Sequence, residues 1–498
     1  MTAPILRPYQ VDAIEQMRLR IQAGKRRLLL VAPTGSGKTV IAAEIIRRMR
    51  ALGKSALFVA GARELIHQTS SKLNDIDVGH GVIMPGYPAK QSDVMVASIQ
   101  TLNRRGQKPV ADLVIIDEAD LARAAMYEAL LEHYSGAVIL GLTATPWRGD
   151  GKGLGAGIKI GEAVVPMFED SFVVATPKQL MAEGHLVPVD LERSFAFEPP
   201  DMSGVKITGG DYDEKQVAEW SRSSTGKKLS GNVVTEYVNR GDGERAVCFG
   251  TNVETSKQLC QLFLDAGVKA EHVDGTTPRD ERAGIFSRIR SGVTRVLCNV
   301  GVVTRGVDIP PLTIAILARP TKSLSLYLQM VGRCMRPSPG KTGMRIFDHA
   351  GLIEKEGHGL PDDERDYSLG ADVVRSKKKA GDLVVLRKRC PSCMRMPPPG
   401  PVCAFCGVPF PVAASQKLAF DETAEARSLA ESAGERVKDH GPGARKVQVA
   451  MLAHLLEQAE SKAWKPKAVE VKFKLRWGFW PPFDLMREAR ALGKMVAA

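Results

Sequence analysis

The sequence predicts an α/β fold in which two parallel-sheet lobes follow one another, with a small metal-binding ribbon and a helical tail after them. Apolar, strand-like runs alternate with helical stretches from residue 6 to about 146, and the alternation begins again after residue 240. Four cysteines then cluster between residues 390 and 406. Alternating strands and helices are typical of a parallel sheet with helices on both faces. We place the four domains at 1–185, 186–372, 373–412 and 413–498.

Length, composition and charge limit the class of protein. The 498 residues suffice for about three domains of roughly 150 residues each. No run approaches the roughly 20 apolar residues of a membrane span, and the N-terminus, MTAPILRPYQ, lacks the pattern of a signal peptide. We therefore expect a cytoplasmic protein with no membrane association. The net charge of +13 favours a polyanionic partner, most commonly nucleic acid, although a merely soluble basic protein is the alternative.

Ten short apolar runs are the expected strands. Those of the first lobe are RLLLVA, SALFVAG, DVMVAS, DLVIID and AVILGLTAT; those of the second are RAVCFGT, AEHVDG, RVLCNV, TIAILAR and GMRIFDHAG. The Gly-rich segment 149–161 is expected to be a loop, and residues 176–190 to form a helix, a glycine stop and an extended crossing. Residues 197–212 are polar and poorly patterned, which indicates a loop or a short insertion.

The stretch APTGSGKT, residues 32–39, fits a phosphate-binding loop, with Ala32 where the strict pattern has Gly. A strand precedes it and a helix follows, so its backbone N–H groups can point at a phosphate. Lys38 would reach the β- and γ-phosphates and Thr39 would ligate Mg²⁺. The residues expected to hold ATP here are Thr34, Gly35, Ser36, Gly37, Lys38 and Thr39.

The stretch LVIIDEAD, residues 113–120, supplies carboxylates at the end of a buried strand. Sheets of this kind bind their ligands at the carboxyl ends of the strands. Asp117 would hold Mg²⁺, and Glu118 would polarise the attacking water. An acidic helix start is the alternative, but the joint presence of Lys38 and Asp117 on alternating β/α segments argues against it.

From Leu6 to about Ala350 the sequence resembles the superfamily-two helicases and translocases of DEAD/DEAH type. The similar segments are LRPYQ (6–10), VAGARELIHQ (59–68), ASIQTL (97–102), GLTATPWR (141–148), NVGVVTRGVDIP (299–310) and YLQMVGRCMRP (327–337). Within this superfamily the sequence most resembles the RadD-like DNA repair helicases of bacteria and phages. The shared features are GLTATP, the run ILARPTKSLSLYLQMVGRCMRPSPGKT and the cysteines after the second lobe. The sixth motif reads Q-x-x-G-R-x-x-R, unlike that of DEAD-box RNA helicases.

The resemblance implies two RecA-like lobes and an ATP-dependent motor acting on DNA in repair, recombination or replication. Gln10 would contact adenine, with Arg7 nearby, and Gly306 and Asp308 would link the nucleic-acid surface to the nucleotide. Arg333 and Arg336 are three residues apart, so on a helix they share a face. They could meet the γ-phosphate from the second lobe as arginine fingers, and Gln329 would sense the same phosphate.

The nucleic-acid groove is expected along loops that follow the strands, where hydroxyls and amides bind phosphates without reading sequence. The candidate contacts are Arg63, Ser98, Gln100, Thr101, Thr251 and Thr304. DNA is favoured over RNA. Single-stranded-DNA-binding or repair proteins are possible partners, and we expect a monomer.

Cys390, Cys393, Cys403 and Cys406 form the pattern C-x₂-C-x₉-C-x₂-C, and four thiolates suit a tetrahedral, structural Zn²⁺ site. A redox site or an iron–sulfur cluster is the minority interpretation. The basic runs RSKKK and LRKR before the cluster are equally consistent with nucleic-acid contact and with a solvated linker. Cys248 and Cys298 lie in apolar runs and are expected to be buried thiols.

The tail segment WKPKAVEVKFKLRWGFWPP mixes cations with aromatic side chains, and we favour a helix there over a strand. Its aromatic side chains could stack on bases or form a small core. Three other functions remain open at this point: an RNA helicase, a restriction-system motor subunit, and a scaffold that binds nucleic acid and ATP without hydrolysis. No nuclease pattern stands out in 370–498, which weakens the second. Lys38, Glu118 and Arg333 argue against the third.

Overall fold

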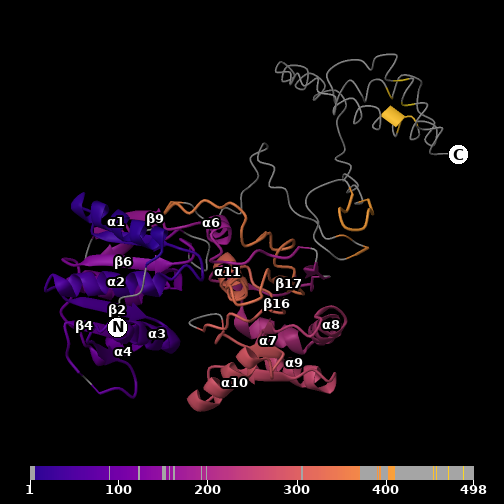
Figure 1. The fold of residues 1–498 in the computed structure, drawn as a ribbon, viewed down its shortest axis with the longest axis horizontal. Helices are drawn as coiled ribbons and strands as arrows, with labels where there is room; N and C mark the ends of the chain where they lie inside the picture. Colours follow the sequence, from indigo (N-terminus) through magenta and orange to yellow (C-terminus); the bar gives the residue numbers. More distant parts are fainter. Residues whose placement is uncertain are drawn as a thin grey trace. The chain divides into compact units, whose positions relative to one another are not determined.

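A computed structural model describes residues 6–370 and parts of the region beyond them (Figure 1). The first range lacks 89, 122–123, 148–152, 156, 161–162, 192, 198 and 304–306; the second comprises 390, 392–393, 402–409, 452, 453, 456, 469, 486 and 489. The chain divides into two units, Met1–Phe410 and Pro411–Ala498. The basic runs before the cysteines, and the predicted helix of the tail apart from Val469, which is helical, lie outside the described residues.

The first lobe is built on a seven-stranded parallel sheet in the order β3-β4-β2-β5-β6-β1-β9. Its strands are β1 Arg27–Val31, β2 Ala56–Ala60, β3 Gly81–Ile83, β4 Val94–Ser98, β5 Leu113–Asp117, β6 Val138–Thr143 and β9 Asp170–Val173. Its helices are α1 Pro8–Gln22, α2 Lys38–Ala51, α3 Arg63–Asp75, α4 Ile99–Arg105, the 3₁₀ turn η1 Ala119–Leu121, α5 Ala124–His133 and α6 Pro177–Ala182.

Both faces of this sheet are covered, which explains why its strands are continuously apolar. Side chains alternate across a strand, so Leu28 and Leu30 pack with α1, α2 and α3. Leu29 and Val31 pack on the opposite face with α4 and α5. Each of these side chains is fully buried and contributes about 2 kcal/mol from the apolar surface removed from water.

The second lobe repeats the plan with a six-stranded sheet in the order β10-β17-β16-β13-β15-β14, in which neighbouring strands are parallel. Its strands are β10 Phe195–Ala196, β13 Ala246–Phe249, β14 Ala270–Val273, β15 Val296–Asn299, β16 Ile314–Leu317 and β17 Arg345–Asp348. Its helices are α7 Glu214–Arg222, α8 Ser224–Arg240, α9 Val253–Asp265, α10 Arg279–Ser291 and α11 Leu324–Gly332. Helices α8 and α9 cover one face and α10 and α11 the other. Two tandem RecA-like lobes are thus confirmed, and Cys248 and Cys298 are buried.

Two segments predicted as irregular contain hairpins. Strand β7 (Gly157–Ile160), inside the Gly-rich segment, pairs with β8 (Ala163–Pro166). The second hairpin joins β11 (Ile207–Thr208) to β12 (Asp211–Tyr212) through Gly209 and Gly210, both at positive φ. The β-branched runs of β7 and β8 are short and lie among glycines, which favour a loop. Strands β11 and β12 have two residues each, too few to show alternation.

The chain passes between the two lobes at two places. After α6 the chain crosses to the second lobe, where the N–H of Val187 donates to the Met335 carbonyl (2.7 Å). Beyond β17, the return segment, residues 361–369, comes back to the first lobe. There Tyr367 stacks on Trp147 with ring centroids 5.5 Å apart, and Gly155 N–H donates to the Leu369 carbonyl (3.2 Å).

Within the described residues, every helix is too short or too polar to cross a bilayer.

Candidate functional site

A cavity of about 490 Å³ opens where β1 and β5 end, and residues from both lobes line it. Many of the side chains selected from the sequence meet here: Arg7, Thr34, Gly35, Gly37, Lys38, Thr39, Asp117, Glu118, Asp308, Arg333 and Arg336. His185 and Gln68 line the same cavity and were not predicted. Gly306 lies outside the described residues.

The phosphate loop has the backbone needed to cradle an anion. Gly35 and Gly37 have φ of 92° and 84°, which residues with a Cβ rarely adopt. Helix α2 begins at Lys38, so its free N–H groups and positive dipole end face the cavity. The Lys38 ammonium donates to the Ala32 carbonyl (2.9 Å). Burial lowers the pKa of Lys38, while Glu118 and Asp117 oppose that shift. This loop fits a nucleoside triphosphate.

Three carboxylates crowd the end of β5. Glu118, with φ of 48°, donates its backbone N–H to Asp117 Oδ1 (3.0 Å). Burial and then the charge of Glu118 raise the pKa of Asp117 to about 7. The same two causes raise the pKa of Asp120 to about 6. A divalent cation between Asp117 and the hydroxyl of Thr39 would relieve this repulsion, so the donor set fits Mg²⁺.

The start of α1 is bound to the phosphate loop. Gln10 Nε2 donates to the Ser36 carbonyl (3.0 Å), and the Tyr9 hydroxyl donates to the same oxygen (2.8 Å). Arg7 Nη1 in turn donates to the Tyr9 hydroxyl (2.8 Å). Gln10 is buried and does not line the cavity, so its contact with adenine stays a prediction.

The second lobe brings its arginines to the cavity from the end of α11. Arg333 Nη1 and Arg336 Nη1 both donate to the Val307 carbonyl (3.2 Å each), and Arg336 pairs with Asp308. Burial, and then the neighbouring Arg336, lower the pKa of Arg333. Gln329 Nε2 lies 3.5 Å from Glu118 Oε2, across the lobe boundary. A Cβ on Gly332 would lie 2.8 Å from the Thr34 side chain, so glycine permits this close approach.

A second cavity, of about 320 Å³, unites four of the residues expected to contact nucleic acid. Arg63, Ser98, Gln100 and Thr101 line it, and Arg104 joins them. Ser98 caps α4 by accepting from Thr101 N, and its hydroxyl donates to Gln100 Oε1 (2.8 Å). These contacts preorganise the loop after β4. Arg104 was missed because its signal was only a basic side chain two residues after the motif.

The remaining two candidates for nucleic-acid contact belong to the second lobe. Thr251 follows β13, and its buried hydroxyl has no hydrogen-bond partner among the described residues. Thr304 lies outside the described residues. The roles of all six candidates stay predictions.

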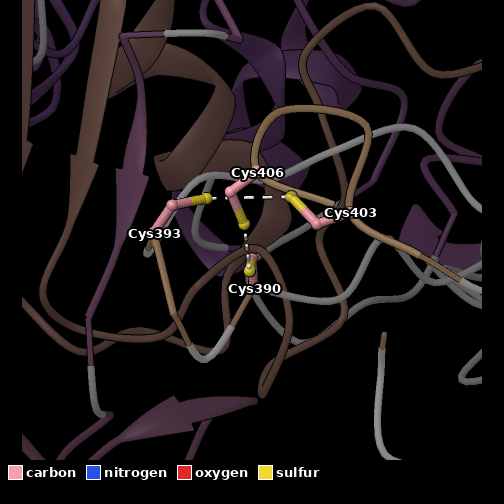
Figure 2. Close-up of side chains that lie close together, drawn as sticks. All are labelled: Cys390, Cys393, Cys403 and Cys406. Atoms are coloured by element: carbon pink, nitrogen blue, oxygen red, sulfur yellow. Dashed lines mark hydrogen bonds between the residues drawn. The ribbon is translucent and has the colours of Figure 1, made fainter. Parts of the chain in front are cut away.

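The four clustered cysteines converge (Figure 2). Their sulfurs all lie within 4.8 Å of one another; Cys390 and Cys406 are 3.5 Å apart and Cys393 and Cys403 are 3.7 Å apart. Sulfurs around a tetrahedral Zn²⁺ with bonds of about 2.3 Å would be separated by about 3.8 Å. The turn is closed by Cys403 N–H donating to the Val408 carbonyl (2.8 Å). The arrangement fits zinc.

Comparison with known proteins identifies both lobes. Residues 4–148 match the family "Type III restriction enzyme, res subunit", and residues 230–338 match "Helicase conserved C-terminal domain". The chain belongs to the superfamily-two helicases. A Lactococcus phage 51.5 kDa protein is 34% identical over 392 residues, covering 77% of this helicase and 78% of that protein.

One further relative is named as a helicase, and one solved structure shares the fold. A Saccharomyces cerevisiae protein named as an ATP-dependent helicase, IRC3, is 31% identical over 70% of this chain. The helicase matches only 52% of the yeast protein's length. A solved fragment described as an HsdR subunit of a Vibrio vulnificus type I restriction enzyme has the same fold, with TM-score 0.53 and 21% identity. The alignment covers 72% of this chain and 67% of the solved fragment. The RadD-like grouping stays a prediction.

A buried hydrogen-bond network between the lobes of the helicase was not predicted. Ser325 on α11 donates to Asp120 Oδ2 (2.5 Å) and accepts from the Thr145 hydroxyl (2.9 Å). Thr143 donates to the other oxygen of Asp120 (2.8 Å). All four side chains are buried. The only signal in the sequence was a serine on the apolar face of α11, and nothing local identifies its partner.

Proposed function

We propose that this helicase couples ATP hydrolysis to movement along DNA, in repair, recombination or replication. One observation carries the proposal: a single cavity is lined by the phosphate loop and Asp117–Glu118 of one lobe and by Arg333 and Arg336 of the other. A site divided between two lobes is complete only when they close, so nucleotide state and lobe separation are coupled.

The residues have distinct roles in this mechanism. The N–H groups of the phosphate loop and the Lys38 ammonium hold the β- and γ-phosphates, while Thr39 and Asp117 hold Mg²⁺, which neutralises developing charge when bound. Glu118 orients the attacking water and accepts its proton. Arg333 and Arg336 exchange the Val307 carbonyl and Asp308 for the γ-phosphate, where they stabilise transition-state charge. Gln329 senses the same phosphate.

DNA is the favoured track. Relatives include proteins named as a DNA 3'-5' translocase and as type I restriction endonuclease subunits. The cavity around Arg63 and Arg104 offers cations and amides to a phosphate backbone without base-specific geometry. We further propose lobes at 1–185 and 186–372, a RadD-like grouping, a cytoplasmic monomer and a structural Zn²⁺ ribbon. Single-stranded-DNA-binding or repair proteins are proposed as partners.

ATP turnover measured with single-stranded DNA, duplex DNA, forked DNA and RNA tests the proposal. Stimulation should be greatest with DNA; stimulation by RNA alone would overturn the assignment of the track. Arg333→Ala should lower turnover by on the order of 10³-fold with little change in ATP affinity. Arg222→Ala is the matched control, because Arg222 pairs with exposed Glu254 on α9, outside the cavity. Equal turnover by isolated residues 1–185 and by the whole chain would exclude the two-lobe site.

A further inference from the structure

The ammonium of Lys341 lies in a cage of main-chain carbonyl oxygens. Its Nζ lies within hydrogen-bond distance of the carbonyls of Pro310 (3.0 Å), Leu312 (2.6 Å), Cys334 (2.6 Å) and Arg336 (2.8 Å). The first two oxygens belong to the segment before β16, and the other two to the turn after α11. Lys341 itself sits in a separate turn, closed by its N–H on the Ser338 carbonyl (3.0 Å).

Holding a charged ammonium in this cage has a desolvation cost. Burial lowers the pKa of Lys341 to about 8, with Cys334 opposing and Arg336 reinforcing the shift. No carboxylate forms an ion pair with Lys341 within the described part of the chain. Its compensation is the four carbonyls, two of which follow the C-terminal end of α11, where the helix dipole favours a cation. A half-buried lysine held in this way fixes the segments whose oxygens it binds.

One of the two segments that Lys341 joins also carries the arginines of the cleft. Arg333 and Arg336 extend from the turn after α11, and both bind the Val307 carbonyl. A guanidinium has five N–H donors, so each arginine can turn toward a phosphate from the same stretch of backbone. The contacts of Lys341 involve no arginine side chain, so they persist while the arginines move.

We propose that Lys341 is a positioning residue for Arg333 and Arg336. By binding carbonyls on both segments, it fixes the backbone from which the arginines reach across the cleft. This inference rests on the proposed function, because it requires that the arginines act on the γ-phosphate. Lys341 itself touches neither nucleotide nor nucleic acid in this scheme.

The test is Lys341→Met in the full-length protein, with Lys355→Met as the matched control. Lys355 lies in the same lobe and donates to a single carbonyl, that of Pro200, away from the cleft. We expect Lys341→Met to lower kcat by about 10²-fold, as for a displaced catalytic group. KM for ATP should change only a few-fold, since the phosphate loop is untouched, and Lys355→Met should behave as wild type.

A double-mutant cycle separates positioning from general stability. If Lys341 acts through the arginines, adding Lys341→Met to Arg333→Ala should slow turnover little further. Additive losses, or identical behaviour of Lys341→Met and Lys355→Met, would overturn the inference. Normal turnover by Arg333→Ala alone would instead overturn the proposed function.

The double-mutant cycle can also be run with a more conservative substitution of Lys341. If thermal unfolding shows that Lys341→Met does not fold, Lys341→Arg takes its place. Arginine keeps the charge, but its planar fork does not direct its donors to four oxygens converging on one point. If Lys341→Arg lowers ATP turnover, and its effect is not additive with that of Arg333→Ala, the result supports a positioning role. Wild-type turnover by that variant, or additivity, contradicts it.

Discussion

Glu118 shows how a single residue combines strain and chemistry. Its φ of 48° places it in the left-handed region, which costs a non-glycine residue on the order of 1–3 kcal/mol. The bend turns its carboxylate into the cavity beside Asp117 and toward Gln329. Backbone strain of this kind persists where the surrounding structure holds the residue in place. Here the fully buried strand β5 holds Glu118.

Replacing Glu118 with Gln should therefore separate binding from hydrolysis. The amide keeps the shape of the side chain and cannot accept the proton of water, while Lys38 and Thr39 still hold the phosphates. We expect ATP affinity within a few-fold of wild type and a turnover lowered by about 10²–10⁴-fold. Equilibrium binding of ATP and steady-state phosphate release measure the two effects. Near-normal turnover would remove Glu118 from the mechanism.

His349 gives the second lobe a pH-dependent stability. It is buried against Phe197, with ring centroids 4.0 Å apart, and its Nε2 lacks a hydrogen-bond partner in the described structure. Burial lowers its pKa from 6.5 to about 3. Between these values the unfolded chain binds the proton and the folded chain does not. Stability is therefore complete above pH 6.5 and falls with pH, by about 2 kcal/mol at pH 5.

His349→Phe should keep the stacking and remove this contribution. The unfolding midpoint of wild type should fall more steeply between pH 7 and pH 5 than that of the variant. Denaturant melts at the two pH values measure the difference. Parallel pH dependences would show that His349 does not carry the effect.

Residues of the phosphate loop and of the acidic strand end could be predicted because their chemistry depends on spacing along a few residues. Ser325 and Lys341 could not. Their roles depend on oxygens contributed by distant segments, and a serine or lysine in isolation is compatible with many environments. Gln10 is intermediate: its position by the loop follows from the resemblance, but its bond to the Ser36 carbonyl does not.

At the level of elements, α11 and the end of β6 form a further contact between the lobes, besides the two chain passages. Helix α11 presents Ser325 to Asp120, while the end of β6 contributes Thr143 and the following loop Thr145. The network therefore connects the acidic strand end of one lobe to the helix that leads to the arginines of the other.

Ser325→Ala should weaken this connection. It leaves Asp120 and Thr145 each short of a buried partner, which costs on the order of 1–3 kcal/mol. We expect basal ATP turnover to fall less than DNA-stimulated turnover, because stimulation requires the lobes to act together. Ser323→Ala is the matched control, since Ser323 caps the same helix from within the second lobe. Equal effects of the two substitutions on the stimulation ratio would assign the loss to helix stability alone.

Ten of the thirteen strands in the two large sheets were predicted, because strands buried on both faces are continuously apolar. Strands β3, β9 and β10 were not: β3 and β10 have only three and two residues, and β9 begins with the polar Asp170 and Ser171. The hairpin of β7 and β8 was not predicted either. Its four-residue strands lie among glycines, and Val164 remains exposed, so neither burial nor alternation marks them.

For the whole molecule, zinc should be separable from the motor. Cys393→Ser should release the one Zn²⁺ expected per chain, because a hydroxyl is a poor ligand in place of a thiolate. Both sheets should stay folded, since their cores contain none of the four cysteines. Metal analysis and basal ATP turnover check this. Retention of zinc, or loss of turnover without DNA, would contradict it.

The same variant tests whether the ribbon contacts DNA through the neighbouring RSKKK and LRKR runs. Loss of such contacts should weaken binding and flatten its salt dependence by about 0.7–0.9 log units of slope per phosphate contact removed. Titrations at several salt concentrations measure the slope. An unchanged slope would leave the ribbon as a structural or protein-binding element.

The return segment changes the mechanics of the helicase. Two bodies joined by one flexible link can rotate about any axis through it. The lobes here are joined by the crossing after α6 and again where Tyr367 and Leu369 meet the first lobe. Once the contacts of α11 and the Arg282–Glu64 ion pair release, these two attachments favour rotation about the line that joins them. We therefore expect the cleft to open and close along a single coordinate, so that the arginines return along the same arc in each cycle.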